Sequence, residues 1–149
     1  MQRDIGGFAL AAKWMKWETI AFVEIDNFCK RVLAKNFPRV PIHNDLTTYN
    51  ARPLRGTVDL LTAGYPCQPF SQAGRRQGEK DPRHLWPYVR RIINQARPTW
   101  CVLENVAGHI TMGLDKVCAQ LEALSYTVQP VIIPACATGA PHRRDRVWI

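Results

Sequence analysis

The sequence has few of the features that mark a metal-binding, secreted or membrane protein. Its five cysteines are widely spaced, and no two of them form the C-x-x-C pair typical of zinc and redox sites. The apolar run at 8–12 is too short for a signal peptide, and no stretch approaches the ~18 apolar residues of a membrane span. We therefore expect a soluble, cytoplasmic protein with no metal site and no membrane contact, in which most cysteines are buried.

Acidic residues are also scarce. The chain carries 12 Asp and Glu against 20 Lys and Arg, which gives a formal net charge of +8. Such an excess favours association with a polyanion, although it says nothing about the fold. With 149 residues, 46% of them hydrophobic and 21% charged, the chain has the composition of a globular protein and the length of one domain.

Short apolar runs alternate with stretches of helical periodicity along the chain. The apolar runs predict strands at 19–23, 58–63, 100–103, 128–133 and 146–149. The periodicity predicts helices beginning near Phe8, after Asp26 as an N-cap, along 85–96 and along 114–124. The helix after Asp26 is expected to bury Phe28, Cys29, Val32 and Leu33.

Strands that alternate with helices in this way are typical of a doubly wound α/β domain with a mainly parallel sheet. In such folds, ligands bind beyond the carboxyl ends of the strands. Four chemically capable side chains follow predicted strands or short extended segments, namely Glu24, Asp45, Cys67 and Glu104.

Three short motifs carry the chemistry of the chain. Cys67 lies between two prolines in the segment Gly-Tyr-Pro-Cys-Gln-Pro-Phe-Ser at 64–71, and prolines fix the direction in which such a loop presents a side chain. Glu-Asn-Val follows at 104–106, and Arg-Asp-Arg follows at 144–146. Taken singly, Cys67 could be an ordinary buried cysteine, Glu104 a helix cap or a solvated charge, and the arginines surface residues. Their occurrence together, in this order, favours a functional interpretation.

With these motifs the chain resembles the DNA (cytosine-5) methyltransferase family along nearly its whole length. Pro66-Cys67-Gln68 is similar to the family's catalytic loop, Glu104-Asn105-Val106 to its Glu-Asn-Val triplet, and Arg144 and Arg146 to its Arg-x-Arg element. Ile5-Gly6-Gly7-Phe8 resembles the end of the family's glycine loop, with Asp4 where the family has a glycine. The resemblance implies a Rossmann-like fold of the S-adenosylmethionine-dependent methyltransferase type, here incomplete.

The mechanism that the resemblance implies suits these residue types. Carbon 5 of cytosine becomes nucleophilic only after a nucleophile adds at carbon 6, and a thiolate both attacks and leaves readily, which is the role implied for Cys67. A carboxyl group that its pocket keeps protonated can donate a hydrogen bond to ring nitrogen 3, which is the role implied for Glu104. Arg146 would donate to the ring carbonyl oxygen, and Arg144 would hold the catalytic loop or a phosphate.

The implied cofactor is S-adenosylmethionine. Gly6 and Gly7 allow close backbone approach before a helix, and Glu24 at the end of the next predicted strand is placed like the acidic residue that binds ribose hydroxyls in dinucleotide folds. By resemblance Ile25 contacts the adenine face and Asp45 accepts from the adenine amine, although Asp45 could also be a simple turn residue. The resemblance assigns four further residues to this site, namely Ile5, Phe8, Gly64 and Pro66.

The implied partner is double-stranded DNA, whose target base has to be flipped out of the helix. Contacts to the DNA are expected from the segment that contains Gln68, Ser71, Arg75, Arg76, Lys80 and Arg83. Basic side chains there can meet phosphates. The alternative is that this glycine-containing, charged loop is only solvated.

We therefore expect 1–149 to be the partial catalytic and cofactor-binding domain of a monomeric DNA cytosine-5 methyltransferase from a prokaryote or phage, as in restriction-modification. The domain would be truncated at both ends and would have no target recognition domain. Two alternatives fit the same motifs: a transfer RNA cytosine-5 methyltransferase, and an inactive remnant with weak nucleic-acid binding.

Overall fold

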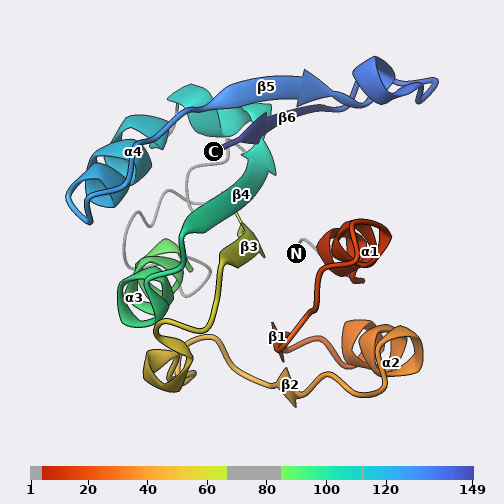
Figure 1. Ribbon diagram of the computed structural model, residues 1–149. Coiled ribbons are helices and arrows are strands. Elements are labelled where there is room, and N and C mark those ends of the chain that lie inside the picture. Colours follow the sequence, from red (N-terminus) through yellow and green to blue (C-terminus); the bar gives the residue numbers. More distant parts are fainter. Residues whose placement is uncertain (1–4, 67–84, 112) are drawn as a thin grey trace. The chain divides into compact units, whose positions relative to one another are not determined.

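The computed structural model describes residues 5–66, 85–111 and 113–149. The chain divides into two compact units, Met1–Asn50 and Ala51–Ile149, and each is described by itself (Figure 1). Among the residues that the structure describes, no helix has the length and apolar character needed to cross a membrane.

The first unit contains two helices and a pair of very short strands. Its elements are α1 (Gly7–Trp14), β1 (Phe22–Val23), α2 (Asn27–Asn36) and β2 (Ile42–His43). The two strands are parallel, with Phe22 opposite Ile42 and Val23 opposite His43. The predicted strand at 19–23 is thus confirmed only over its last two residues.

Helix α2 begins where the sequence predicts. The Asp26 side chain accepts hydrogen bonds from the backbone N–H groups of Phe28 (2.9 Å) and Cys29 (3.0 Å), which are otherwise unsatisfied at a helix start. Cys29 and Leu33 are buried one turn apart, as predicted. The prediction that Phe28 is buried was wrong, because Phe28 lies roughly 100° around the helix from Cys29 and is 50% exposed.

The second unit is built on a four-stranded sheet with the order β3-β4-β6-β5. Its elements are η1 (Arg52–Leu54), β3 (Leu60–Gly64), α3 (Trp86–Ala96), β4 (Trp100–Val106), η3 (Ala107–Thr111), α4 (Leu114–Glu122), β5 (Val131–Pro134), η4 (Ala135–Thr138) and β6 (Asp145–Trp148). Each predicted strand and helix of this unit is present, with bounds that differ by one to a few residues.

The strand directions follow the connections. β3 and β4 are parallel and are joined through helix α3, as an α/β fold requires. β6 runs antiparallel to both β4 and β5. The connection between β5 and β6 holds only the short turn η4, and a parallel pairing needs a crossover of a dozen or more residues. The α/β class is therefore confirmed, with parallel pairing in β1–β2 and β3–β4 and antiparallel pairing at the C-terminal strands.

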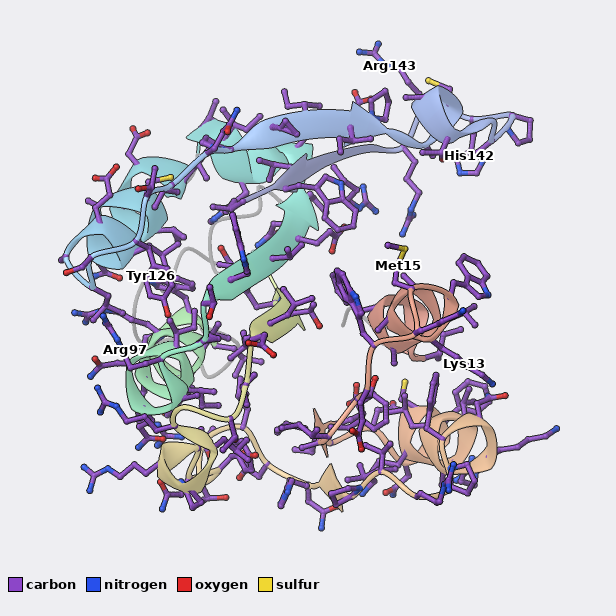
Figure 2. The ribbon with its side chains drawn as sticks, in the orientation of Figure 1. Lys13, Met15, Arg97, Tyr126, His142 and Arg143 are labelled. Carbon is purple, nitrogen blue, oxygen red and sulfur yellow. The ribbon has the colours of Figure 1, made fainter. Side chains whose placement is uncertain are left out.

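Helices α3 and α4 supply most of the core of this unit. Their buried side chains repeat with helical spacing and are Trp86, Val89, Ile92, Ile93 and Ala96 on α3 and Leu114, Val117 and Leu121 on α4. Arg97 directly follows α3, and its guanidinium donates to the Leu124 carbonyl (2.7 Å) and lies over the Tyr126 ring. Figure 2 labels Arg97 and Tyr126 at this end of the helix. The Tyr126 hydroxyl donates to the Pro98 carbonyl (2.7 Å). These contacts fix the end of α3 opposite to the strand ends at which ligands are expected.

The cysteines differ from the expectation that most are buried. Cys29 is buried, Cys101 and Cys118 are half-buried, and Cys136 is exposed. Burial raises the pKa of the Cys101 thiol to about 11, so this thiol stays protonated at neutral pH. Cys67 lies outside the described residues.

Candidate active site

The carboxyl ends of β3 and β4 lie side by side in the second unit. Gly64, the last residue of β3, is opposite Glu104 of β4, and the chain continues from Gly64 through Tyr65 and Pro66 toward Cys67. Cys67 lies outside the described residues, and so do six other predicted site residues: Gln68, Ser71, Arg75, Arg76, Lys80 and Arg83. The register therefore brings Glu104 next to the strand that leads to the cysteine motif.

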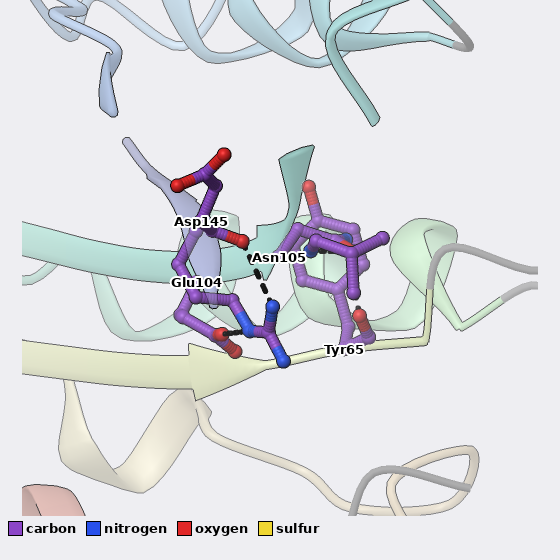
Figure 3. Close-up of polar contacts among 6 residues, drawn as sticks. Tyr65, Glu104, Asn105 and Asp145 are labelled. Carbon is purple, nitrogen blue, oxygen red and sulfur yellow. Dashed lines mark hydrogen bonds and ion pairs between the residues drawn. The ribbon is translucent and has the colours of Figure 1, made fainter. Parts of the chain in front are cut away.

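Glu104 and Arg146 form an ion pair at this edge (Figure 3). The Nε of Arg146 lies 2.8 Å from Oε1 of Glu104, and a second guanidinium nitrogen donates to the Asp145 carbonyl (2.8 Å). Strands β4 and β6 pair Glu104 with Trp148 and Val106 with Arg146, so the two charged residues are diagonal neighbours on one face of the sheet. Glu104 is only 8% exposed, and a buried carboxylate needs such a partner. The two motifs that were singled out separately in the sequence thus meet.

Arg144 has different surroundings from Arg146. It lies in the exposed stretch before β6 with a positive φ of 37°. Its neighbours Arg143 and Asp145 form a mostly exposed ion pair at 3.3 Å, and Figure 2 shows Arg143 and His142 at the turn between β5 and β6. The two arginines of the Arg-x-Arg element therefore have different surroundings.

Asn105 connects the Glu-Asn-Val triplet to the cysteine motif. Its side chain is fully buried, donates to the backbone carbonyl of Tyr65 (3.0 Å) and accepts from the backbone N–H of Val106 (2.9 Å) (Figure 3). The amide thereby ties the end of β4 to the peptide bond that precedes Pro66. The sequence marked Asn105 as part of a motif but gave it no role.

Sequence reasoning missed a buried polar cluster behind this edge. The hydroxyl of Tyr65 and Nε2 of His109 are hydrogen-bonded at 3.1 Å, and the Tyr65 ring contacts the Trp86 ring with centroids 5.3 Å apart. The indole N–H of Trp86 donates to the Gln120 side chain (2.6 Å). Burial lowers the pKa of His109, so this imidazole is neutral at pH 7. The one available signal was that Tyr65 and Trp86 flank the long polar segment.

In the first unit, the Gly6-Gly7 pair opens helix α1. Gly6 has a φ of +95°, and a Cβ placed on it would lie 3.0 Å from the Phe37 ring and 3.1 Å from the Leu33 side chain. Glycine is therefore required at position 6 for both its backbone conformation and its packing. Gly7 has open space where a Cβ would be. The flanking Ile5 is exposed and Phe8 is half-buried.

Glu24, Ile25 and Asp45 gather at the carboxyl ends of β1 and β2. The backbone N–H of Glu24 donates to the His43 carbonyl (2.9 Å), which continues the parallel ladder and brings Glu24 beside the residues that precede Asp45. The Glu24 carboxylate accepts from the Asp26 N–H (2.7 Å), and the Asp45 carboxylate accepts from the Thr47 N–H (2.7 Å). Ile25 is 62% exposed.

This set of acceptors and surfaces fits an adenosine group. Ionised carboxylates have several acceptor positions, so Glu24 and Asp45 can accept from ribose hydroxyls and an adenine amine while keeping their turn contacts. An exposed isoleucine offers a flat ring an apolar face. The turn interpretation of Asp45 and its binding interpretation are therefore compatible.

The comparisons with known proteins identify the family. Residues 2–149 match the family model of C-5 cytosine-specific DNA methylases. The chain belongs to this family. The type II methyltransferase M.DsaV of Dactylococcopsis salina is 38% identical over 152 residues, a match that covers 97% of this chain and 42% of M.DsaV. The type II methyltransferase M2.BsuMI of Bacillus subtilis is 34% identical, and the match covers 96% of this chain and 38% of that protein.

Solved structures agree with this assignment. A putative DNA modification methyltransferase encoded within an E. coli prophage has a TM-score of 0.75 at 26% identity, with 98% of this chain and 43% of that chain covered. The Dnmt2 methyltransferase of S. pombe has a TM-score of 0.79 at 21% identity and covers 98% of this chain and 47% of its own, which supports the fold alone. The chain spans about two fifths of the length of the curated relatives named above.

Proposed function

We propose that this chain is the catalytic region of an enzyme that transfers a methyl group from S-adenosylmethionine to carbon 5 of cytosine in double-stranded DNA. The observation that carries the proposal is the buried Glu104–Arg146 ion pair, which stands at the edge where β3 leads to Pro66 and Cys67. A carboxyl group and a guanidinium on one face can address neighbouring ring positions of a flipped cytosine. Type II methyltransferases among the relatives favour a role in DNA modification.

Each residue has a defined part in the proposed reaction. The Cys67 thiolate would form a bond to carbon 6 of the ring, and the Glu104 carboxyl group would hydrogen-bond to nitrogen 3, where negative charge develops. Arg146 donates to the ring carbonyl oxygen, and Arg144 holds a phosphate or the catalytic loop. The methyl group would reach carbon 5 as its bond to the cofactor sulfur breaks, which leaves S-adenosylhomocysteine. Loss of the carbon-5 proton to water would then let the ring expel the thiolate and regenerate Cys67.

The cofactor would be held mainly by residues of the first unit. Glu24 would accept from the ribose hydroxyls, Ile25 would contact the adenine face, and Asp45 would accept from the adenine amine. The Gly6-Gly7 backbone would lie against the cofactor at the start of α1, with Ile5 and Phe8 beside it. The family resemblance also assigns Gly64 and Pro66 to cofactor binding. When bound, S-adenosylmethionine supplies an electrophilic methyl group.

The DNA would be bound by phosphate contacts and by contacts to the flipped base. We assign the phosphate contacts to the basic residues after the cysteine motif, which are Arg75, Arg76, Lys80 and Arg83. Gln68 and Ser71 would lie near the flipped nucleotide. These assignments depend on the family match and on residue chemistry.

A covalent trapping experiment tests the proposal. The 149-residue chain, and a chimaera in which it replaces the matched segment of M.DsaV, are incubated with S-adenosylmethionine and duplex DNA that contains 5-fluorocytosine. Fluorine at carbon 5 cannot be eliminated as a proton is, so the protein–DNA bond should persist in at least the chimaera. Cys67→Ser should abolish the adduct and Cys118→Ser should leave it intact.

Two outcomes would contradict this assignment. An undiminished adduct in Cys67→Ser would exclude Cys67 as the nucleophile. Methyl transfer to transfer RNA but not to duplex DNA, measured with tritiated cofactor, would place the chain in the transfer RNA branch instead.

A further inference from the structure

Tyr65, just after the end of β3, is held by hydrogen bonds at both its backbone and its side chain. Its carbonyl accepts from the Asn105 amide (3.0 Å), and its hydroxyl is hydrogen-bonded to His109 (3.1 Å). Only 2% of Tyr65 is exposed, so a hydroxyl without a partner would be costly there. The Tyr65 and His109 rings are also nearly perpendicular, at 86°, with their centroids 5.7 Å apart.

Tyr65 also contacts Trp86, which follows the segment 67–84 in the sequence. Trp86 is the first residue of α3, and its ring contacts the Tyr65 ring at 5.3 Å. The Trp86 indole is in turn held by Gln120 of α4 (2.6 Å). Tyr65 and Trp86 therefore join the end of β3 to the start of α3, and His109 and Gln120 fasten both to neighbouring elements.

We propose that Tyr65, fixed by His109 and Trp86, is the positioning residue that sets the direction in which the chain enters Cys67. This inference rests on the proposed role of Cys67 as the nucleophile. Proline at position 66 fixes its own φ and restricts Tyr65 to extended conformations, which limits the paths that the chain can take after Tyr65. Misplacement of a reacting group lowers the rate more than it lowers binding, so loss of the Tyr65 anchor should appear in the rate.

The anchoring is tested in the full 149-residue chain by hydrogen exchange. The reporter amides are Tyr88 and Val89, which donate to the Leu85 carbonyl, and Val106, which donates to the Asn105 side chain. Tyr65→Phe keeps the ring but removes the hydroxyl, and we expect these amides to exchange about two- to tenfold faster, as the loss of one hydrogen bond implies. Tyr126→Phe is the matched control, because it removes a tyrosine hydroxyl bond to Pro98 in the same unit. Unchanged exchange in Tyr65→Phe, or equal acceleration in Tyr126→Phe, would overturn the proposal.

The positioning role is tested by adduct formation in the form of the protein that is active in the trapping experiment. Tyr65→Phe should slow adduct formation at saturating DNA by about two- to tenfold and leave unchanged the DNA concentration that gives half the maximal rate. His109→Leu should slow adduct formation by the same factor. The double variant Tyr65→Phe with His109→Leu should be no slower than either single variant. His109→Gln, which keeps a hydrogen-bonding partner for Tyr65, should retain most of the unmodified rate.

The outcomes separate this inference from the proposed function. If the unmodified protein forms no adduct, the proposed function fails, and the exchange result still decides whether Tyr65 anchors the two borders. The positioning role is wrong if adducts form and Tyr65→Phe reacts as fast as the unmodified protein. It is also wrong if the rate decreases caused by Tyr65→Phe and His109→Leu add up in the double variant. In both cases the assignment of Cys67 as the nucleophile is unaffected.

Discussion

At the scale of single residues, the surroundings of Gly6 and His109 have consequences for stability. Gly6 combines a left-handed backbone with close contacts to Phe37 and Leu33, whereas its neighbour Gly7 has neither constraint. His109 is an imidazole buried deeply enough for its pKa to fall. Both residues allow predictions in which a nearby or similar residue serves as the control.

Gly6→Ala should destabilise the chain. The substitution forces a Cβ into a positive-φ conformation and against the Phe37 ring, and we expect a loss of about 1–3 kcal/mol in the free energy of unfolding. Gly7→Ala should leave stability unchanged or raise it by up to about 1 kcal/mol, since alanine favours a helix start with open space. Urea unfolding of both variants measures the difference. Equal stability of the two variants would contradict the constraint at Gly6.

Stability should fall as the pH falls below neutrality. Burial lowers the pKa of His109 from 6.5, so the unfolded chain takes up this proton more readily than the folded chain. The contribution of His109 is therefore fully present above pH 6.5 and is lost as the pH falls from 6.5 through the lower pKa of the folded state. Urea unfolding from about pH 8 to 5 should show a shallower pH dependence in His109→Gln than in the unmodified chain. His142→Gln, a substitution at an exposed position, is the control variant.

At the scale of elements, the functional edge depends on contacts between strands. β4 supplies Glu104 and Asn105, β6 supplies Arg146, and β3 leads to the cysteine motif. The Glu104–Arg146 pair crosses from β4 to β6 and is mostly buried, whereas the Arg143–Asp145 pair beside it is exposed. The two pairs should differ sharply in their effect on stability.

Arg146→Met should cost about 3–5 kcal/mol in the free energy of unfolding, because the buried Glu104 would lose its ion pair with the guanidinium. The double variant Glu104→Gln with Arg146→Met should recover most of this loss. Arg143→Met should cost less than ~1 kcal/mol, since water screens the exposed pair. A loss in Arg146→Met no larger than in Arg143→Met would show that the buried pair does not hold β6 to β4. Thermal and urea unfolding give these values.

The elements themselves were largely predictable from the sequence, and the contacts between them were not. Periodicity located α3 with its buried face, and Asp26 located the start of α2. The sequence pattern could not assign the direction of β6, because that direction depends on the length of a connection. It also could not predict that Phe28 is exposed. Family motifs pointed to Glu104 and Arg146, but nothing local relates Tyr65 to His109, which are 44 positions apart in the sequence.

At the scale of the whole molecule, the net charge of +8 predicts how DNA binding responds to salt. Each phosphate that the protein neutralises should contribute about −0.9 to the slope of log affinity against log salt. We expect weak binding of duplex DNA by the chain with a clear negative slope and little dependence on base sequence, because phosphate contacts carry no sequence information. Arg75→Gln should make the slope less steep by about 1 if this residue meets a phosphate. Fluorescence anisotropy on several duplexes at a series of salt concentrations gives the slope, and a slope near zero would contradict phosphate binding.

The diagonal placement of Glu104 and Arg146 also selects one alignment of β6 against β4. Successive side chains of a strand point to opposite faces, so a slip of β6 by one residue would turn Arg146 away from Glu104. The same slip would remove Val147, which is fully buried, from the core and bring a neighbouring side chain to its place. A misaligned hairpin would therefore lose an ion pair and a core contact together. The carboxylate and guanidinium that we assign to recognition of the flipped cytosine therefore also stabilise the correct register of β6 against β4.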